Sequence, residues 1–181
     1  MSVPSPFSRV SATEPAAAPG DSAVRAVLQA LGWLVLCFGA AAFGSQFAPG
    51  SWYAGLRKPD WTPPSWLFGP VWTALYTMMA VSAWRIQRRG RKVPGLAGPA
   101  RLALIAFLVQ LVLNALWSWI FFGLRQPGLA LIEIVALGLA IAACIRLFHP
   151  IDRPAALLLI PYLAWVTFAS VLNGALWWLN R

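Results

Sequence analysis

The residues best placed to do chemistry in this sequence are its tryptophans. Four of the eleven tryptophans and four prolines lie in one stretch, "WYAGLRKPDWTPPSWLFGPVWTALY", which runs from Trp52 to Tyr76. Flat indole rings next to stiff residues suit three roles: a rigid interfacial turn, a membrane aromatic belt, or one wall of a site for a flat ligand. The stretch alone leaves all three open.

Groups for ordinary catalysis are scarce, because the sequence offers no acid–base pair, nucleophile or metal-ligand cluster. Cys37 and Cys144 lie deep in separate apolar runs, where we predict that they pack as small hydrophobes without forming a disulfide. The one histidine, His149, precedes Pro150 at the end of an apolar run and is predicted to lie in an interfacial loop. We expect no metal site, no catalytic residue of the usual kinds and no required cofactor.

Composition points to a lipid environment. The chain of 181 residues is 60% hydrophobic and only 10% charged, whereas a typical soluble domain is about 25% charged. The formal charge of +9 comes from basic residues that cluster in short gaps between apolar runs. That distribution is typical of membrane proteins and argues against nucleic acid as a partner.

The sequence predicts an all-α membrane protein built as a bundle of five transmembrane helices. Residues 1–22, rich in Ser, Ala and Pro, are predicted to form a disordered tail, followed by one domain over residues 23–181. The apolar stretches are about 20 residues each, enough to cross a hydrocarbon core of about 30 Å. Helices are expected because backbone groups in lipid need internal partners. The predicted spans are roughly 24–47, 66–86, 102–123, 128–148 and 155–178.

Basic residues predict the orientation of the bundle. With five spans, one side of the membrane would hold ten of the fourteen Lys and Arg residues, including the "RIQRRGRK" loop, and the other side four, namely Arg57, Lys58, Arg125 and Arg181. The positive-inside rule then places the N-terminus in the cytoplasm. The chain is expected to be a multi-pass protein of the bacterial cell membrane.

Two predicted helices carry stripes of aromatic and amide residues at helical spacing. The second span aligns Trp72, Tyr76, Met79 and Ala83, and the third aligns Gln110, Asn114, Trp117 and Phe121. An amide facing lipid tails would have no partner, so the third-span stripe is predicted to face the bundle interior. Hydrogen bonding between helices and contact with a ligand are both consistent with these amides.

Two further features lie in the fourth and fifth spans. Glu133 is the only acid well inside a span, where a charge costs roughly 2.5–3.5 kcal/mol on insertion scales. Both a functional role and a protonated or water-linked carboxyl are consistent with its place near the start of its helix. In the fifth span Pro161 is predicted to kink the helix, and one stripe holds Trp165, Ala169 and Leu172.

These segments together resemble the translocator protein family, also called TspO/MBR, tryptophan-rich sensory proteins or peripheral-type benzodiazepine receptors. The resemblance rests on the stretch quoted above, then on "QLVLNALWSWIFFGLRQPG" and "PYLAWVTFASVLN", in this order and spacing. It implies a five-helix bundle, usually a homodimer, with a ligand pocket between the helices that is capped by the loop joining the first two.

The resemblance also implies a ligand class. The family binds porphyrins, notably protoporphyrin IX, and synthetic isoquinoline carboxamides and benzodiazepines. Carried over by position, the pocket would comprise Trp52, Trp61, Trp72, Asn114, Trp117, Phe121, Trp165, Ala169 and Leu172, to which the stripes add Tyr76 and Gln110. Trp72 and Trp165 match the tryptophans that the family links to porphyrin breakdown, so they are the candidate redox residues.

This sequence departs from the family pattern at two places. Gly174 stands where the cholesterol-recognition pattern of animal members needs a tyrosine, so cholesterol binding is not supported. Ser118 and Trp119 replace the two prolines that follow the third-span tryptophan in the family. Without these prolines the kink expected there, and with it the local pocket shape, is in question.

Three functions remain as hypotheses. The first is a membrane receptor or transporter that binds tetrapyrroles and acts in porphyrin transport, homeostasis or stress sensing. The second is an enzyme that degrades porphyrin in light through the pocket tryptophans. The third is a sensor that acts through a partner protein, for which the sequence carries no signature.

Overall fold

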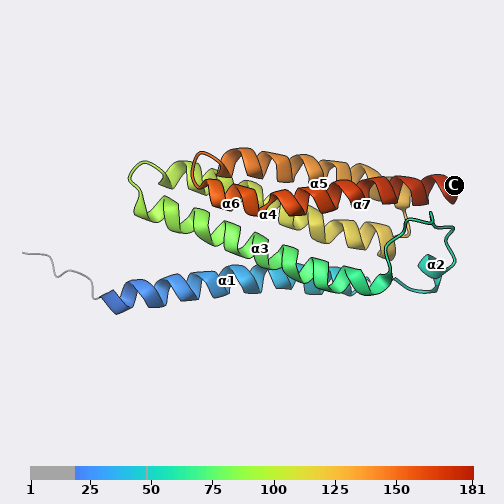
Figure 1. The fold of residues 1–181 in the computed structure, drawn as a ribbon, viewed down its shortest axis with the longest axis horizontal. Coiled ribbons are helices and arrows are strands. Elements are labelled where there is room, and N and C mark those ends of the chain that lie inside the picture. The colour runs from blue at the N-terminus through green and yellow to red at the C-terminus, as the bar shows by residue number, and fades with distance from the viewer. Residues whose placement is uncertain (1–18, 48) are drawn as a thin grey trace, which may run out of the picture.

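The computed structural model describes residues 19–47 and 49–181, and within these it is helical without any strand (Figure 1). The all-α prediction is therefore confirmed for the described residues. Most of the predicted tail, residues 1–18, lies outside them, and the first helix begins at Pro19.

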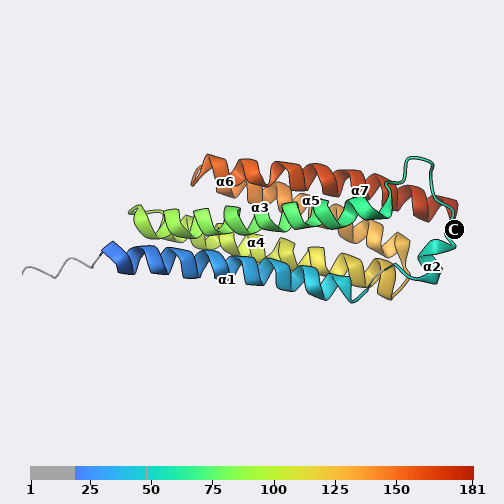
Figure 2. The same cartoon turned by 60° about the horizontal axis from the view of Figure 1, so that its bottom comes forward.

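Long helices run side by side along the molecule, and the connections between them lie at its two ends (Figures 1 and 2). The short helix α2 lies at the same end as the C-terminus. In chain order the elements are α1 (Pro19–Ser45), α2 (Ser51–Ala54), α3 (Ser65–Lys92), α4 (Ala97–Ser118), the π-helical turn η1 (Trp119–Gly123), α5 (Pro127–Phe148), α6 (Arg153–Leu158) and α7 (Ile160–Leu179).

Four helical segments in the described part of the chain are long and apolar enough to cross a membrane: Ala23–Ser45, Ala97–Gly123, Pro127–Phe148 and Arg153–Leu179. The predicted second span, 66–86, is not among them. It lies in α3, whose first half mixes Trp, Tyr and Thr with apolar residues and whose last turns carry five cations. Its length alone would suffice to cross the hydrocarbon core, at 28 residues.

The prediction of a loop at "RIQRRGRK" is wrong, because α3 continues through this segment to Lys92. Arg, Gln and Lys are good helix formers, and cations are favourable in the last turn of a helix. Gly90 allows α3 to pack closely against α4, since a Cβ at this position would lie 2.4 Å from the Cβ of Ala100. The helix therefore ends only where the chain must turn into α4.

The predicted fifth span, 155–178, is divided into α6 and α7, with Leu159 between them. The break immediately precedes Pro161, where a kink was expected, because proline cannot donate to the preceding turn. Asp152 begins α6 as an N-cap, and its carboxylate accepts a hydrogen bond from the Ala155 N–H at 3.2 Å.

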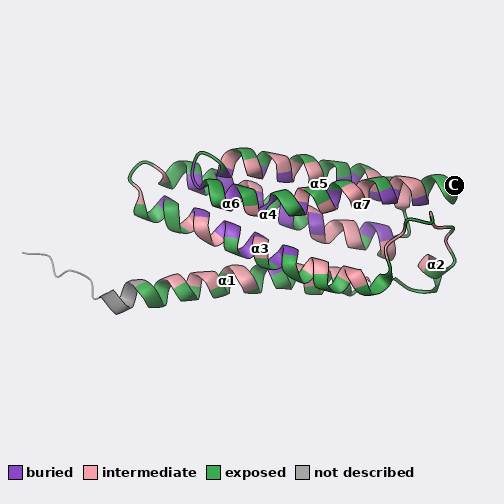
Figure 3. Ribbon diagram, in the orientation of Figure 1, coloured by how far each residue is buried: buried purple, intermediate pink, exposed green. Residues whose placement is uncertain are grey.

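Buried residues concentrate on the faces that the helices turn toward one another (Figure 3). The largest include Met79, Phe107, Phe148 and Tyr162, which are almost completely inaccessible. Cys37 and Cys144 are buried and unpaired, as predicted. The outer face of α1 exposes apolar side chains such as Val24, Leu28 and Val35, which suits contact with lipid.

Candidate functional site

The loop between α1 and α3, of which residues 49–64 are continuous in the structure, folds over one end of the bundle; we call residues 49–64 the capping loop (Figure 1). Trp52 packs edge-on against Phe121 of η1, with ring centroids 5.9 Å apart. Trp61 packs against Phe168 of α7 at the same distance. The two predicted loop tryptophans thus attach the capping loop to different walls of the bundle.

Burial raises the pKa of one phenol in the capping loop, that of Tyr53. Its ring packs between Phe121 and Phe122, and the Lys58 ammonium lies 4.7 Å from its centroid. Desolvation raises the pKa of Tyr53 above its usual range, so the hydroxyl stays protonated at neutral pH.

Aromatic rings from α3 and α7 meet in a seam below the capping loop. Phe68 packs against Trp165 with centroids 5.7 Å apart, and Trp72 approaches Tyr162 at 6.4 Å. Trp165 continues to Phe168 at 5.6 Å, which in turn contacts Trp61. We call Phe68, Trp72, Tyr162, Trp165 and Phe168 the aromatic seam. A row of flat side chains therefore leads from the capping loop into the bundle.

A polar triad lies beside this seam. Asn114 of α4 accepts a hydrogen bond from the Tyr76 hydroxyl of α3 and donates one of 2.8 Å to the Tyr162 hydroxyl of α7. All three residues are buried. Trp72 packs against one member of the triad, with its ring centroid 5.4 Å from that of Tyr76. Asn114 therefore links α3, α4 and α7 through hydrogen bonds. This is one of the two roles that the sequence left open for this amide.

A second aromatic group lies where α4 passes into η1. Trp117 stacks on Phe121 with centroids 5.1 Å apart, and its indole N–H donates to Asn173 of α7 at 3.1 Å. The Asn173 amide donates in turn to the Pro127 carbonyl at 2.7 Å. Leu172 is buried in the same cluster.

The helix is irregular at η1 although the two family prolines are missing. The Leu124 N–H donates to the Trp119 carbonyl at 2.8 Å, five residues back, which widens the turn. A Cβ on Gly123 would lie 3.0 Å from ring atoms of both Phe47 and Trp119. The π-helical turn thus forms without a proline, at a place where Gly123 packs closely against two aromatic rings.

Two polar side chains stand buried and without hydrogen-bond partners among the described residues. They are Gln110, of which both amide atoms are unpaired, and Glu133, of which both carboxylate oxygens are unpaired. The burial of Gln110 and Asn114 confirms that the third-span stripe faces the interior. Such groups are costly in the apolar interior unless something satisfies them.

The predicted site residues are therefore divided between two groups of rings. Trp61, Trp72, Tyr76 and Trp165 belong with the aromatic seam, whereas Trp52, Trp117, Phe121 and Leu172 surround η1. Ala169 is half-buried on α7 between them. Gln110 is buried on α4, one turn before Asn114.

Sequence reasoning missed several residues of the site. Phe68 precedes Trp72 by four positions, and Tyr162 and Phe168 each lie three positions from Trp165, so helical spacing could have identified all three. Asn173 and Asn180 had no such signal, because their roles depend on partners far away in the chain.

Metal binding finds no support within the described part of the chain, where no group of three or more His, Cys, Asp or Glu side chains lies together. Beside the aromatic rings, the buried interior holds phenol hydroxyls, amides and the carboxyl of Glu133. Such a lining can bind a flat apolar molecule and orient it through a few polar atoms.

Several apolar helices with aromatic rings and amides gathered in the interior define a multi-pass integral membrane protein. The chain belongs to the TspO/MBR family, whose sequence profile matches residues 33–179. It is 40% identical over 151 residues to Protein CrtK of Rhodobacter capsulatus, covering 82% of this chain and 90% of that protein.

Two further relatives support the same assignment. A tryptophan-rich protein TspO of Chlorobaculum tepidum is 41% identical over 148 residues, which is 80% of this chain and 91% of that protein. A translocator protein of Homo sapiens is 40% identical over 137 residues, which is 74% and 79% of the two chains. The resemblance to the family is thereby confirmed.

Proposed function

We propose that this protein binds a flat tetrapyrrole, such as protoporphyrin IX, between the capping loop and the aromatic seam, and acts in porphyrin transport, homeostasis or stress sensing. The observation that carries the proposal is the arrangement of Phe68 and Trp72 on α3 opposite Trp165 and Tyr162 on α7. The names of relatives, a translocator protein and a tryptophan-rich sensory protein, agree with these roles.

The physical basis is stacking between flat surfaces in a dry interior. Indole rings offer a large apolar face with little conformational freedom to lose on binding. The Trp72 and Trp165 rings are half-buried, so side-chain movement can present them to a macrocycle. Gln110 and Glu133 supply unpaired buried polar atoms that can orient polar edges of a ligand.

The test is a titration of the purified protein with protoporphyrin IX, followed through the porphyrin's own absorbance band. Binding in the aromatic seam predicts a saturable shift of this band and co-elution of pigment with protein. A linear, non-saturating response equal to that of empty detergent micelles would contradict the proposal.

In this proposal α3 also crosses the membrane, which brings the number of spans to five, and the N-terminus is cytoplasmic in the bacterial cell membrane. Arg85, Arg88, Arg89, Arg91 and Lys92 would then occupy the cytoplasmic interface, where the positive-inside rule favours them. Exposed Arg91 and Arg125 lie at opposite ends of the bundle and suit cysteine labelling in a chain without Cys37 and Cys144. An impermeant maleimide should label R125C but not R91C from outside; the reverse would overturn the orientation.

We propose that a homodimer forms through α4. Ile105, Leu108, Val109, Val112 and Leu113 line an apolar groove of about 310 Å³ on its outer face. Val109 is 52% exposed in one copy and offers a cross-linking position. V109C should cross-link in membranes, whereas exposed V35C on α1 should not; equal cross-linking of both would contradict this interface.

Photochemical degradation of porphyrin is a second candidate. It is favoured because both candidate redox residues belong to the aromatic seam. Trp72 contacts Tyr162, and Trp165 contacts Phe68. Illuminated protein with protoporphyrin IX should yield a product that is absent in the dark and from W72F/W165F. If light gives the same products with and without protein, this candidate fails.

A further inference from the structure

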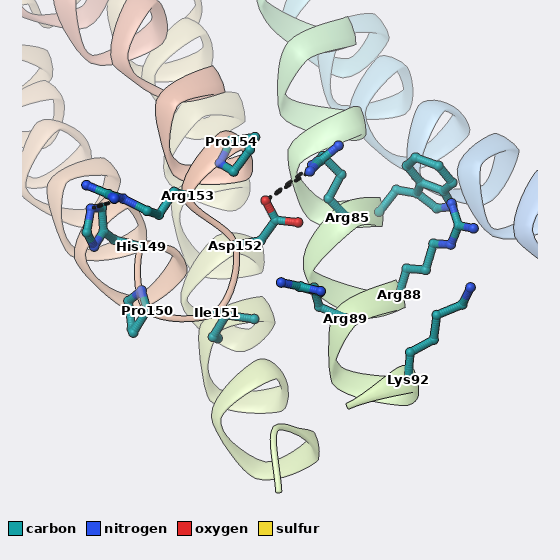
Figure 4. A pocket seen from close by; sticks show the side chains of 11 residues that line it. Arg85, Arg88, Arg89, Lys92, His149, Pro150, Ile151, Asp152, Arg153 and Pro154 are labelled. Carbon is teal, nitrogen blue, oxygen red and sulfur yellow. Dashed lines mark hydrogen bonds and ion pairs between the residues drawn. The ribbon is translucent and has the colours of Figure 1, made fainter. Parts of the chain in front are cut away.

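The end of the bundle opposite the capping loop carries an open cavity of about 990 Å³ (Figure 4). Its walls come from the last turns of α3 on one side and from the turn between α5 and α6 on the other. This cavity takes no part in the aromatic site.

The lining of the cavity is strongly cationic. Five cations and one carboxylate line it: Arg85, Arg88, Arg89, Lys92, Arg153 and Asp152. The one ion pair found among the described residues joins Arg85 to Asp152 at 3.1 Å, so this carboxylate is already engaged. The four other cations have no carboxylate opposite them within the lining.

Part of the charge has a structural explanation. The Arg85–Asp152 pair, together with the 2.7 Å hydrogen bond from the Ser82 hydroxyl to the Ala155 carbonyl, attaches α6 to α3. Cations at the end of α3 also suit its dipole. Neither effect explains why Arg153, from a different helix, lines the same cavity.

The walls hold some of these cations in place. The Arg88 guanidinium lies 5.2 Å from the centre of the Trp84 ring, and the Trp84 indole donates to the Ala26 carbonyl of α1 at 3.0 Å. Arg153 donates to His149 at 3.3 Å. In Figure 4 Arg89 points from α3 toward the turn that carries Asp152. Donors fixed in this way lose less conformational entropy when they bind an anion.

We propose that this cavity binds a phosphate-bearing anion, either the headgroup of an anionic phospholipid or a soluble phosphate compound. Arginine donors match phosphate oxygens in bidentate geometry, and several cations together suit a multiply charged group. The volume greatly exceeds that of a single water, whose share of the liquid is about 30 Å³. Basic pockets between transmembrane helices at the membrane surface are suited to phospholipid headgroups.

The test compares two triple variants that remove equal charge from the same end of the bundle. R88Q/R89Q/K92Q removes three cavity cations, all of which are exposed, so we expect the variant to fold. R91Q/R101Q/R146Q removes three exposed cations outside the cavity lining. Binding is measured on delipidated protein by native mass spectrometry and by the thermal shift, with cardiolipin, phosphatidylcholine or inorganic pyrophosphate as probe.

The wild-type protein should bind cardiolipin but not phosphatidylcholine. The cavity variant should bind cardiolipin about a hundredfold more weakly, at roughly fivefold per basic residue. The control variant should stay within about twofold to threefold of wild type. If pyrophosphate binds with the same variant dependence while cardiolipin does not, the anion comes from solution and the site stands. Equal losses in both variants, or no binding of either probe, would overturn the proposal.

Discussion

Asn180 hydrogen-bonds both backbone groups of Arg57. Its side-chain oxygen accepts from the Arg57 N–H at 2.9 Å, and its amide donates to the Arg57 carbonyl at 3.0 Å. A single side chain after the last helix thus pairs with the capping-loop backbone in the way that a neighbouring strand would. Since the residues are 123 positions apart, this contact ties the entry of the site to the end of the chain.

Asn180→Ala is predicted to loosen the capping loop. Its two hydrogen bonds to Arg57 are lost, each contributing about 0.5–1.5 kcal/mol net, together with a third to the Leu176 carbonyl of α7, so the amide of Arg57 should exchange with deuterium about tenfold faster. Release of bound porphyrin should accelerate in parallel. Arg181→Gln is the matched control, because Arg181 lies 3.2 Å from the Trp178 ring centre, while both hydrogen bonds to the Arg57 backbone come from Asn180. Unchanged exchange at Arg57 in Asn180→Ala would contradict the role of this contact.

Asn114 and Gln110 are predicted to respond differently to replacement by leucine. Asn114→Leu leaves the hydroxyls of Tyr76 and Tyr162 without their partner, at a cost of about 1–3 kcal/mol. Gln110→Leu removes an amide that has no partner, so the stability of the ligand-free protein should be unchanged or higher. Thermal unfolding in one detergent measures both. Equal destabilisation by the two variants would refute the distinction.

The crossing of α3 and α4 is predicted to depend on the missing side chain at position 90. Gly90→Ala puts a methyl group 2.4 Å from the Cβ of Ala100, and such overpacking costs about 1–3 kcal/mol. Moving the methyl group across the interface, in G90A/A100G, should restore most of the thermal stability. A double variant no more stable than Gly90→Ala would show that the close approach is not the cause.

Much of this architecture was predictable from local pattern. The spacing of Gln110, Asn114, Trp117 and Phe121 predicts one helical face, and burial of Gln110, Asn114 and Phe121 bears this out. The break ahead of Pro161 follows from the missing proline N–H. These features depend on residues close together in the chain, so periodicity and local stereochemistry suffice.

What the sequence did not predict depends on packing between distant segments. The charges at the end of α3 predict a solvent-exposed loop, whereas α3 stays helical there and Gly90 allows it to contact α4. The widened turn at η1 is closely packed against Phe47 of another segment. The cationic cavity unites Arg153 with the end of α3 only once the chain has folded.

The central claim, that rings of α3 and α7 together hold a tetrapyrrole, is tested most directly by the affinity of W72L/W165L for protoporphyrin IX, read from porphyrin absorbance. The control is W177L/W178L, which removes two exposed indoles from the end of α7. Loss of two stacking partners should weaken binding about tenfold or more in the first variant and leave the second near wild type. Equal affinity of both variants for the porphyrin would contradict the account.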